Sequence, residues 1–245
     1  MSAFGPGANH GLLLEPIPPA VGFVGGIGGD LPEILPSGDW EPYLPVFEAQ
    51  SKLGLETMNC VQFSRLNACE IQANFHGKPL NLSDRFLYWA SGCTERGNTF
   101  SACNYGLKRY GAPPESSWPW VGPLTREQYG TEPPPDVQAE AEKILDEWDI
   151  GQLVWVPATI EKMKAALKKG PLWFCNDFHA MTIYRIDDHI RVFDTYGNGK
   201  GAFYLEYVSQ IEACYLAPFT PKHLVPKPPM NYPRNSLIVV VDGLG

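Results

Sequence analysis

The chain has 245 residues, a formal net charge of −8 and 44% hydrophobic residues. This length is enough for one large core or two small ones, and we expect one domain with tails. The negative charge, with no Lys/Arg cluster, excludes a nucleic-acid partner, and no stretch reaches the roughly 20 apolar residues of a membrane helix. The N-terminus lacks a basic segment followed by an apolar run, so we expect no secretory signal.

The first 38 residues form an arm of unusual composition. They contain nine glycines and six prolines and show no lasting periodicity, which indicates an extended segment that is ordered only against something else. The first predicted helix runs from Cys60 to about Asn74. Its apolar positions fit one helix face, namely Val61, Phe63, Leu66, Cys69 and Ile71.

Three more helices are predicted in the middle of the chain. Ser83 is the expected N-cap of a helix that continues through Trp89, and the stretch 97–111 predicts a short helix ending at Gly111. After the three prolines at 133–135, "DVQAEAEKILDEWD" predicts a strongly periodic helix.

The second half of the chain is rich in β-forming residues. "VWVPA" (154–158) predicts a strand, and the stretch 159–170 predicts a helix with Thr159 as N-cap and Gly170 at its end. Four β-rich runs follow: "PLWFCND", "HAMTIYRIDD", "HIRVFDTYG" and "AFYLEY". Helices first and sheet second predict an α+β domain of two lobes, with any site between them.

The cysteines indicate reduced thiols. There are six, too few for a disulfide scaffold of this length, and no pair has CxxC spacing. The histidines near them are not set at metal-ligand intervals, so we expect no metal site. The sequence implies no organic cofactor either. Cys69, Cys103 and Cys214 are expected to be small apolar core residues.

Cys60 stands where a helix should begin, and a helix N-terminus favours the reactive thiolate. Of the five histidines, His179 alone opens an apolar strand, and Asp194 ends the next strand 15 residues later. If these strands pair antiparallel, Asp194 returns to the level of His179 and can hold the imidazole tautomer that accepts the thiol proton. Taken alone, Cys60 also fits an ordinary buried thiol, and His179 an ordinary core histidine.

Six fragments, in order, resemble those of papain-like cysteine peptidases. "MNCVQFSRLNACE" resembles the nucleophile helix, and "HAMTIYRID" the strand of the catalytic histidine. The others are "NLSDRFLYW", "GNTFSACNYGLKRYGAPPESSWPW", "MKAALKKGPLWF" and "DTYGNGKGAFYLEY". The resemblance covers about residues 39–216. Short peptidases of this kind occur in tailed-phage genomes, so the resemblance favours a phage-encoded branch.

The resemblance implies roles for particular residues. Cys60 is the expected nucleophile, His179 the base and acid, Asp194 the orienting residue and Gln50 the oxyanion donor. Tyr196 stands where the family has a tryptophan that shields the orienting residue. The chain also departs from the family pattern: among other differences, Asp194 replaces the usual asparagine, Val61 follows the cysteine in place of an aromatic residue, and Gln50 lies ten residues before Cys60, further than usual. A longer loop must therefore bring Gln50 back to the neighbourhood of Cys60.

The predicted organisation is an arm (1–38), a papain-like catalytic domain (39–217), and a Pro-rich linker with an apolar strand (218–245). The resemblance implies a thiol hydrolase of peptide or isopeptide bonds, acting in the host cytoplasm or a phage virion. One alternative is a peptidoglycan amidase or endopeptidase of a phage particle. Another is a non-catalytic virion component that keeps the papain fold.

The last part of the chain predicts an attachment segment. Residues 218–233 contain six prolines, too many for a helix or a central strand. Five consecutive apolar residues, Leu237 to Val241, follow with strong strand preference. Such an end either folds back on the protein's own sheet or adds a strand to a partner. The second reading implies anchoring in an assembly through the tail, and through the arm in the same way.

Overall fold

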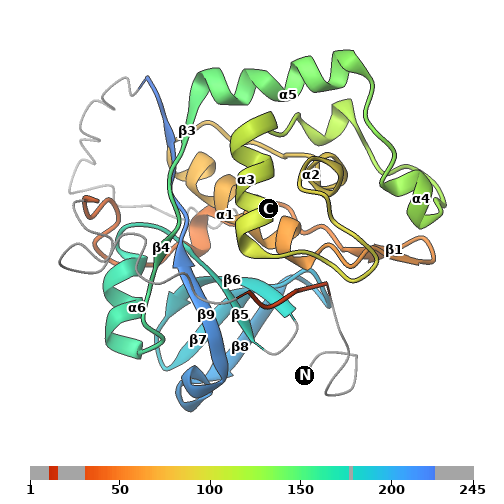
Figure 1. Ribbon diagram of the computed structural model, residues 1–245. Coiled ribbons are helices and arrows are strands. Elements are labelled where there is room, and N and C mark those ends of the chain that lie inside the picture. Colours follow the sequence, from red (N-terminus) through yellow and green to blue (C-terminus); the bar gives the residue numbers. More distant parts are fainter. Residues whose placement is uncertain (1–10, 16–30, 177–178, 224–245) are drawn as a thin grey trace, which may run out of the picture.

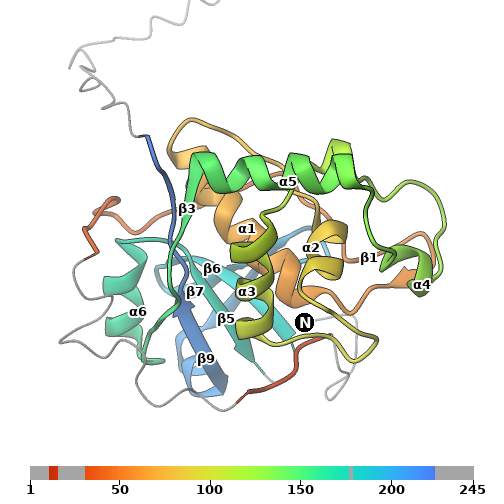
Figure 2. The same ribbon diagram turned by 45° about the horizontal axis from the view of Figure 1, so that its top comes forward.

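The computed structural model describes residues 11–15, 31–176 and 179–223. Helices α1, α2, α3 and α5 gather on one side of the molecule, and a sheet with helix α6 forms the other side (Figures 1 and 2). This arrangement confirms the predicted α+β class with a helical and an antiparallel β part. The C-terminal "SLIVVVDGLG" strand that the sequence predicts lies outside the described residues.

The helix boundaries predicted at Ser83 and Gly111 are confirmed. The Ser83 side chain accepts a hydrogen bond from the N–H of Phe86, and Thr99 caps the next helix in the same way. Gly111 ends that helix with a φ of +72°, a conformation that favours glycine. The helices of this part are α1 (Cys60–Phe75), α2 (Asp84–Ala90), α3 (Phe100–Tyr110), α4 (Arg126–Tyr129) and α5 (Pro135–Glu147), with 3₁₀ turns at Glu41–Tyr43 and Glu115–Ser117.

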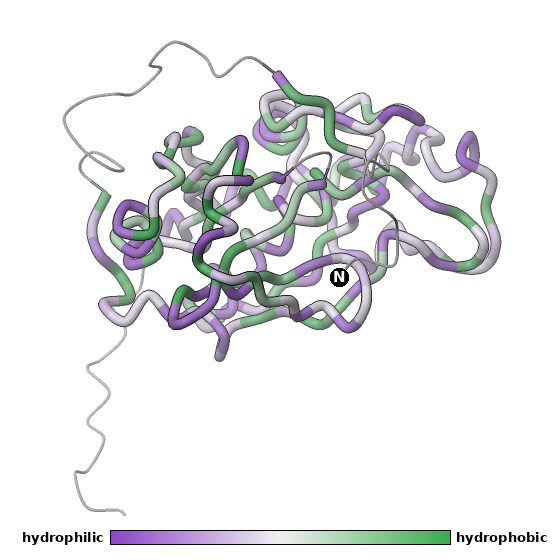
Figure 3. Tube along the Cα trace, turned by 90° about the horizontal axis from the view of Figure 1, so that it is seen from below, coloured by the Kyte–Doolittle hydropathy of each residue, from purple (hydrophilic) through white to green (hydrophobic). Residues whose placement is uncertain are grey.

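Six antiparallel strands form the main sheet, in the order β4-β9-β5-β6-β7-β8. Their bounds are β4 Val154–Trp155, β5 Leu172–Asn176, β6 His179–Ile186, β7 His189–Phe193, β8 Lys200–Tyr204 and β9 Ile211–Leu216, with a 3₁₀ turn at Leu205–Gln210 before β9. Figure 3 shows hydrophobic and hydrophilic stretches alternating along the chain, with hydrophilic residues at several outer turns. Helix α6 (Ile160–Leu167) starts after its predicted cap Thr159 but ends before Gly170. Gly170 instead faces β9, where an added Cβ would lie 2.8 Å from Leu216 Cδ1.

Two short strand pairs were not predicted. Strands β1 (Ser51–Lys52) and β2 (Leu55–Glu56) form a hairpin, and β3 (Trp148–Ile150) pairs with β10 (Phe219–Pro221). Strand β3 cuts the predicted helix over 136–149 short at Glu147. Strand β10 lies at the start of the Pro-rich segment and is held by the stacking of Phe219 on Trp148, with ring centroids 4.4 Å apart. A proline is tolerated there because the strand has a single neighbour.

Helix α1 is the central element of the fold. The sequence predicted one apolar face, but 14 of its 16 residues are buried, including the fully buried Arg65. The Arg65 guanidinium donates to Asn104 Oδ1 (3.1 Å) and to the carbonyl of Ala217 (3.4 Å). These bonds join α1 to α3 and to the end of the sheet, and they offset part of the cost of burying a charge.

All six cysteines are free and buried, so the structure contains no disulfide, as the sequence predicted. Cys69, Cys103 and Cys214 lie in the core with at most 1% of their surface exposed. Within the described residues, no helix is long and apolar enough to cross a membrane.

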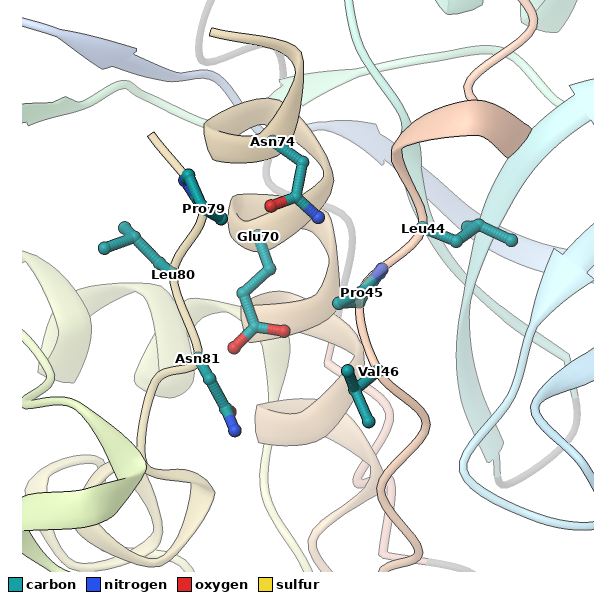
Figure 4. Close-up of a pocket in the computed structure, with 8 residues that line it drawn as sticks. All are labelled: Leu44, Pro45, Val46, Glu70, Asn74, Pro79, Leu80 and Asn81. Carbon is teal, nitrogen blue, oxygen red and sulfur yellow. The ribbon is translucent and has the colours of Figure 1, made fainter. Parts of the chain in front are cut away.

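Buried carboxyl groups collect where α1 meets α2. Glu70 forms one wall of a cavity of about 370 Å³, beside Asn74 and Asn81 (Figure 4). Burial raises the pKa of both Glu70 and Asp84 well above the usual range, and neighbouring carboxylates raise it further. Burial also raises the pKa of Glu115 to about 7. These groups favour their neutral forms in the folded protein.

The Glu115 carboxyl predicts a loss of stability with rising pH. Its pKa rises from 4.5 to about 7 on folding, so its contribution is fully present below pH 4.5 and is lost as the pH rises to about 7. Glu115→Gln, which stays neutral, should make the urea midpoint fall less between pH 5 and pH 8 than in the wild type. The matched control is Glu127→Gln, at an exposed position of α4, which should follow the wild type. Equal slopes for all three proteins would contradict the assignment.

Candidate active site

Cys60 is the first residue of α1 and has no exposed surface. The N-cap residue Asn59 does not cap the helix with its side chain. Its amide donates instead to the Asp84 carbonyl (3.1 Å) and the Tyr129 hydroxyl (3.3 Å), which fixes the chain before the helix. The N-terminus of the helix therefore has no side-chain acceptor from its cap residue, and a helix N-terminus favours an anion.

Strand β6 lies directly beside this first turn. Burial raises the pKa of Cys60 well above the usual thiol range, the backbone N–H of Ala180 lowers it by hydrogen bonding to the sulfur, and Asp194 and Glu56 raise it through their charges. The sulfur is thus held against the residue that follows His179. The balance favours the neutral thiol in this state.

His179 and Asp194 are brought together by strand pairing. Strands β6 and β7 pair antiparallel, with Ile186 opposite Ile190 at the turn, as the sequence predicted. His179 Nε2 lies 2.7 Å from Asp194 Oδ1, and His179 is 7% exposed. The same carboxylate oxygen accepts the backbone N–H of Thr195 (2.6 Å). These two contacts fix the carboxylate. Because Asp194 engages Nε2, Nδ1 is the ring nitrogen that Asp194 does not contact.

Tyr196 packs on the imidazole from the position that the sequence suggested. Its ring centroid lies 5.2 Å from that of His179, at an interplanar angle of 48°. Its hydroxyl donates to Glu56 Oε2 (2.8 Å), and burial raises its pKa above the usual range. Tyr196 therefore stays protonated and covers one side of the His179 ring.

The β1–β2 hairpin explains how Gln50 reaches the site from ten residues before Cys60. Ser51 pairs with Glu56, and Thr57 donates to the Gln50 carbonyl through both its N–H (3.3 Å) and its hydroxyl (2.9 Å). The hairpin thus closes the extra length and places Gln50 beside Thr57, three residues before the cysteine. This is the longer loop that the sequence required.

Two residues that the sequence analysis did not select orient the Gln50 amide. The Thr195 hydroxyl donates to Gln50 Oε1 (2.6 Å), and Gln50 Nε2 donates to Glu56 Oε1 (2.8 Å). Because the oxygen of the Gln50 amide faces the Thr195 hydroxyl, the nitrogen of the amide points toward Glu56 and the loop before Cys60. Thr195 follows the predicted Asp194 directly, which was the one available signal. Glu56 has no sequence signal, because its role depends on tertiary contacts.

The cavity of Figure 4 lies apart from these residues, since none of Cys60, His179, Asp194 and Gln50 lines it. In the described part of the chain, one group of His, Cys, Asp or Glu side chains lies close enough to hold a metal: Asp187, Asp188 and His189 at the β6–β7 turn. Its carboxylates pair with Arg191. It includes none of the four predicted site residues.

No protein-family model and no curated protein sequence matches the chain. Several solved structures, in contrast, are similar to the chain. Xylellain, a cysteine protease from Xylella fastidiosa, is 17% identical over 76% of this chain and 85% of its own, with a TM-score of 0.58. A clostridial cysteine protease after propeptide cleavage is 14% identical over 75% and 57%, with a TM-score of 0.59. A cysteine protease of Carica candamarcensis is 14% identical over 75% and 96%, with a TM-score of 0.51. The chain therefore has the α+β fold of papain-like cysteine proteases.

The charge of Glu56 provides a test of the site's electrostatics. Because this carboxylate raises the pKa of Cys60, Glu56→Gln should move the pH profile of Cys60 alkylation by iodoacetamide to lower pH. The matched control is the exposed Glu95→Gln, which should leave the profile unchanged. Mass mapping of the alkylated cysteine keeps the readout specific to Cys60. A profile in Glu56→Gln identical to that of the wild type would show that the two groups do not interact.

Proposed function

We propose that the protein is a cysteine peptidase that hydrolyses peptide or isopeptide bonds through an acyl-enzyme on Cys60. The observation that carries the proposal is the 2.7 Å contact of His179 Nε2 with Asp194, formed beside the residue whose N–H bonds the Cys60 sulfur. A thiol, an imidazole and an orienting acceptor converge from a helix start and two strands. That is the arrangement that nucleophilic acyl transfer requires.

In the proposed mechanism, His179 Nδ1 takes the Cys60 proton while Asp194 holds Nε2–H and stabilises the imidazolium. The thiolate attacks the substrate carbonyl carbon. The Cys60 backbone N–H and the second Nε2 hydrogen of Gln50 stabilise the oxyanion. His179 then protonates the leaving amine, and a water molecule activated by His179 hydrolyses the thioester. Every proton transfer in this sequence passes through Nδ1 of His179.

The role of Gln50 is supported by the bonds that fix its amide. The Thr195 hydroxyl donates to Gln50 Oε1, and the Glu56 carboxylate accepts one of the two Nε2 hydrogens of Gln50. Donors that are already oriented in the free protein need no reorganisation during the reaction, which is the condition for strong oxyanion stabilisation. Glu56 and Thr195 are positioning residues in this proposal.

The finer assignment is a phage-encoded enzyme whose substrate is a polypeptide or peptidoglycan. It rests on the short domain and the order of the sequence fragments. The arm and the tail would then anchor the protein in a virion, and the alternative is a virion component with an unused triad. Hydrolysis of purified murein, compared with hydrolysis of a polypeptide library, separates the two substrates.

The nucleophile is tested by Cys60→Ala. This change should abolish peptide hydrolysis and labelling by an electrophilic peptide probe during prolonged incubation, because no other thiol is paired with His179. The matched control is Cys93→Ala, a neighbouring buried cysteine, which should keep both properties. Mass mapping identifies the labelled residue. Labelling mainly at Cys69 or Cys103 would overturn the assignment.

The orienting residue is tested by Asp194→Asn. The amide oxygen can accept the same N–H bond from His179, so kcat/KM should stay within about tenfold of the wild type. Asp194→Ala, which lacks an acceptor, should lose more. A loss above about a thousandfold in Asp194→Asn, roughly 4 kcal/mol of barrier, would mean that the negative charge itself is required.

A further inference from the structure

The short helix α4 contacts the chain just before the nucleophile. Arg126, its first residue, donates from Nη2 to the Glu56 carbonyl (2.6 Å) and from Nη1 to the Thr57 carbonyl (3.0 Å). Figures 1 and 2 both show α4 next to the β1–β2 hairpin, which ends at Glu56. One planar guanidinium thus holds two consecutive carbonyl groups, a geometry that arginine provides and lysine does not.

The peptide unit between Thr57 and Met58 is held at both of its polar groups. Its carbonyl accepts from Arg126, and its N–H donates to Glu56 Oε1 (3.0 Å). Because a peptide unit is planar, two bonds at its opposite edges prevent it from rotating. Such a rotation would change the φ of Met58 and redirect the chain that leads to Cys60. We call the two groups that block it, the Arg126 guanidinium and the Glu56 carboxylate, the peptide clamp.

Met58 has a backbone conformation that needs this support. Its φ is +59°, in the left-handed region that L-residues other than asparagine and aspartate rarely adopt. Rotation of the preceding peptide unit would return φ to negative values and release the strain. Both bonds of the clamp to this unit involve a charged group, and such bonds are roughly twice as strong as those between neutral groups. Together they outweigh the preference of one residue for negative φ.

Helix α4 is itself anchored, so that Arg126 is presented from a fixed position. The helix begins with a capping box between Thr125 and Gln128. The Arg85 side chain of α2 donates to the carbonyls of Tyr129 (3.1 Å) and Gln128 (2.7 Å). Tyr129 is also 1% exposed. These contacts tie α4 to α2, which packs on the nucleophile helix.

We infer that Arg126 is a positioning residue of the proposed oxyanion site and acts through the backbone. The peptide clamp holds the Thr57–Met58 unit, and this unit sets how the chain enters α1 and where the Cys60 N–H points. The Glu56 carboxylate of the clamp also accepts from the Gln50 amide (2.8 Å). One clamp therefore aligns both oxyanion donors before a substrate arrives. The inference rests on the proposed function, since an oxyanion forms only in acyl transfer.

The test is hydrolysis of a fluorogenic peptide chosen from a peptide library with the wild type. Arg126→Lys keeps the charge but loses the fork, so kcat should fall about tenfold or more while KM stays within about twofold. The pH midpoint of Cys60 alkylation by iodoacetamide, which needs no oxyanion donor, should stay unchanged. Arg126→Gln, a smaller neutral side chain, should give the same pattern and serves if the lysine disturbs packing.

The matched control is Arg109→Lys on α3, where an exposed guanidinium bonds the Tyr105 hydroxyl. It should leave kcat, KM and alkylation as in the wild type. An unchanged kcat in Arg126→Lys would overturn the inference. So would a parallel change of kcat, KM and the alkylation midpoint, because that pattern marks a general structural defect.

Met58→Asn tests whether Arg126 acts through the strained peptide unit. Asparagine adopts the left-handed conformation more readily than methionine, so less strain remains for the clamp to hold. In the Met58→Asn background, Arg126→Lys should therefore lower kcat by no more than about threefold, against about tenfold in the wild-type background. Equal losses in both backgrounds would contradict a role through Met58.

Amide hydrogen exchange separates the clamp from the proposed function, because it needs no hydrolysis. Peptides covering residues 56–60 should exchange at least about fivefold faster in Arg126→Lys than in the wild type and in Arg109→Lys, since the Thr57–Met58 unit is released. Faster exchange in a protein whose wild type hydrolyses no peptide would support the clamp and refute the proposed function. Unchanged exchange, with hydrolysis by the wild type intact, would refute the clamp and leave the proposed function standing.

Discussion

The N-terminal half of α1 is held on the sheet by buried hydrogen bonds, and the geometry of the site depends on that contact. The Thr182 hydroxyl on β6 donates to the Ser64 carbonyl (2.8 Å), and the Trp173 indole on β5 donates to the Ser64 hydroxyl (2.8 Å). Both bonds act one turn beyond Cys60. Because the thiol belongs to the helix and the imidazole to β6, this contact sets the distance between them. In the proposed acyl transfer, a displacement of about 1 Å here would cost roughly a hundredfold in rate.

Polar side chains extend the same constraint along α1. Gln72 donates to the Ala217 carbonyl (3.1 Å) and accepts the Phe219 N–H (3.0 Å), so the end of the sheet is tied to the C-terminal part of the helix. Arg65 bonds the Ala217 carbonyl as well. A buried polar group that loses its partner costs about 1–3 kcal/mol. The helix therefore cannot shift by small steps, and the two parts of the protein behave as one unit around the site.

Local signals in the sequence were enough to predict most of the helices and the β6–β7 pairing. Ser83 and Gly111 mark helix ends through bonds and dihedral angles that involve only near neighbours. The β1–β2 hairpin was missed because its tip contains Leu53 at a φ of 53°, a conformation that leucine rarely adopts. The pairing of β3 with β10 was missed because those strands are far apart in the chain. Glu56 and Thr195 were missed because their roles arise from bonds that exist only after folding.

The length of the β1–β2 hairpin can change without a change in the geometry of the site. Its tip is open, since Leu53 is 49% exposed and a Cβ added to Gly54 would meet nothing within 4 Å. Its base is fastened, because Thr57 bonds Gln50 and the Lys52 ammonium lies 4.9 Å from the centre of the Trp120 ring. Extra residues at the tip cost little entropy, about 0.6 kcal/mol for each doubling of a loop. Evolution can therefore lengthen or shorten this tip freely, and an engineer can attach a fluorophore there while the bonds that fix Gln50 stay in place.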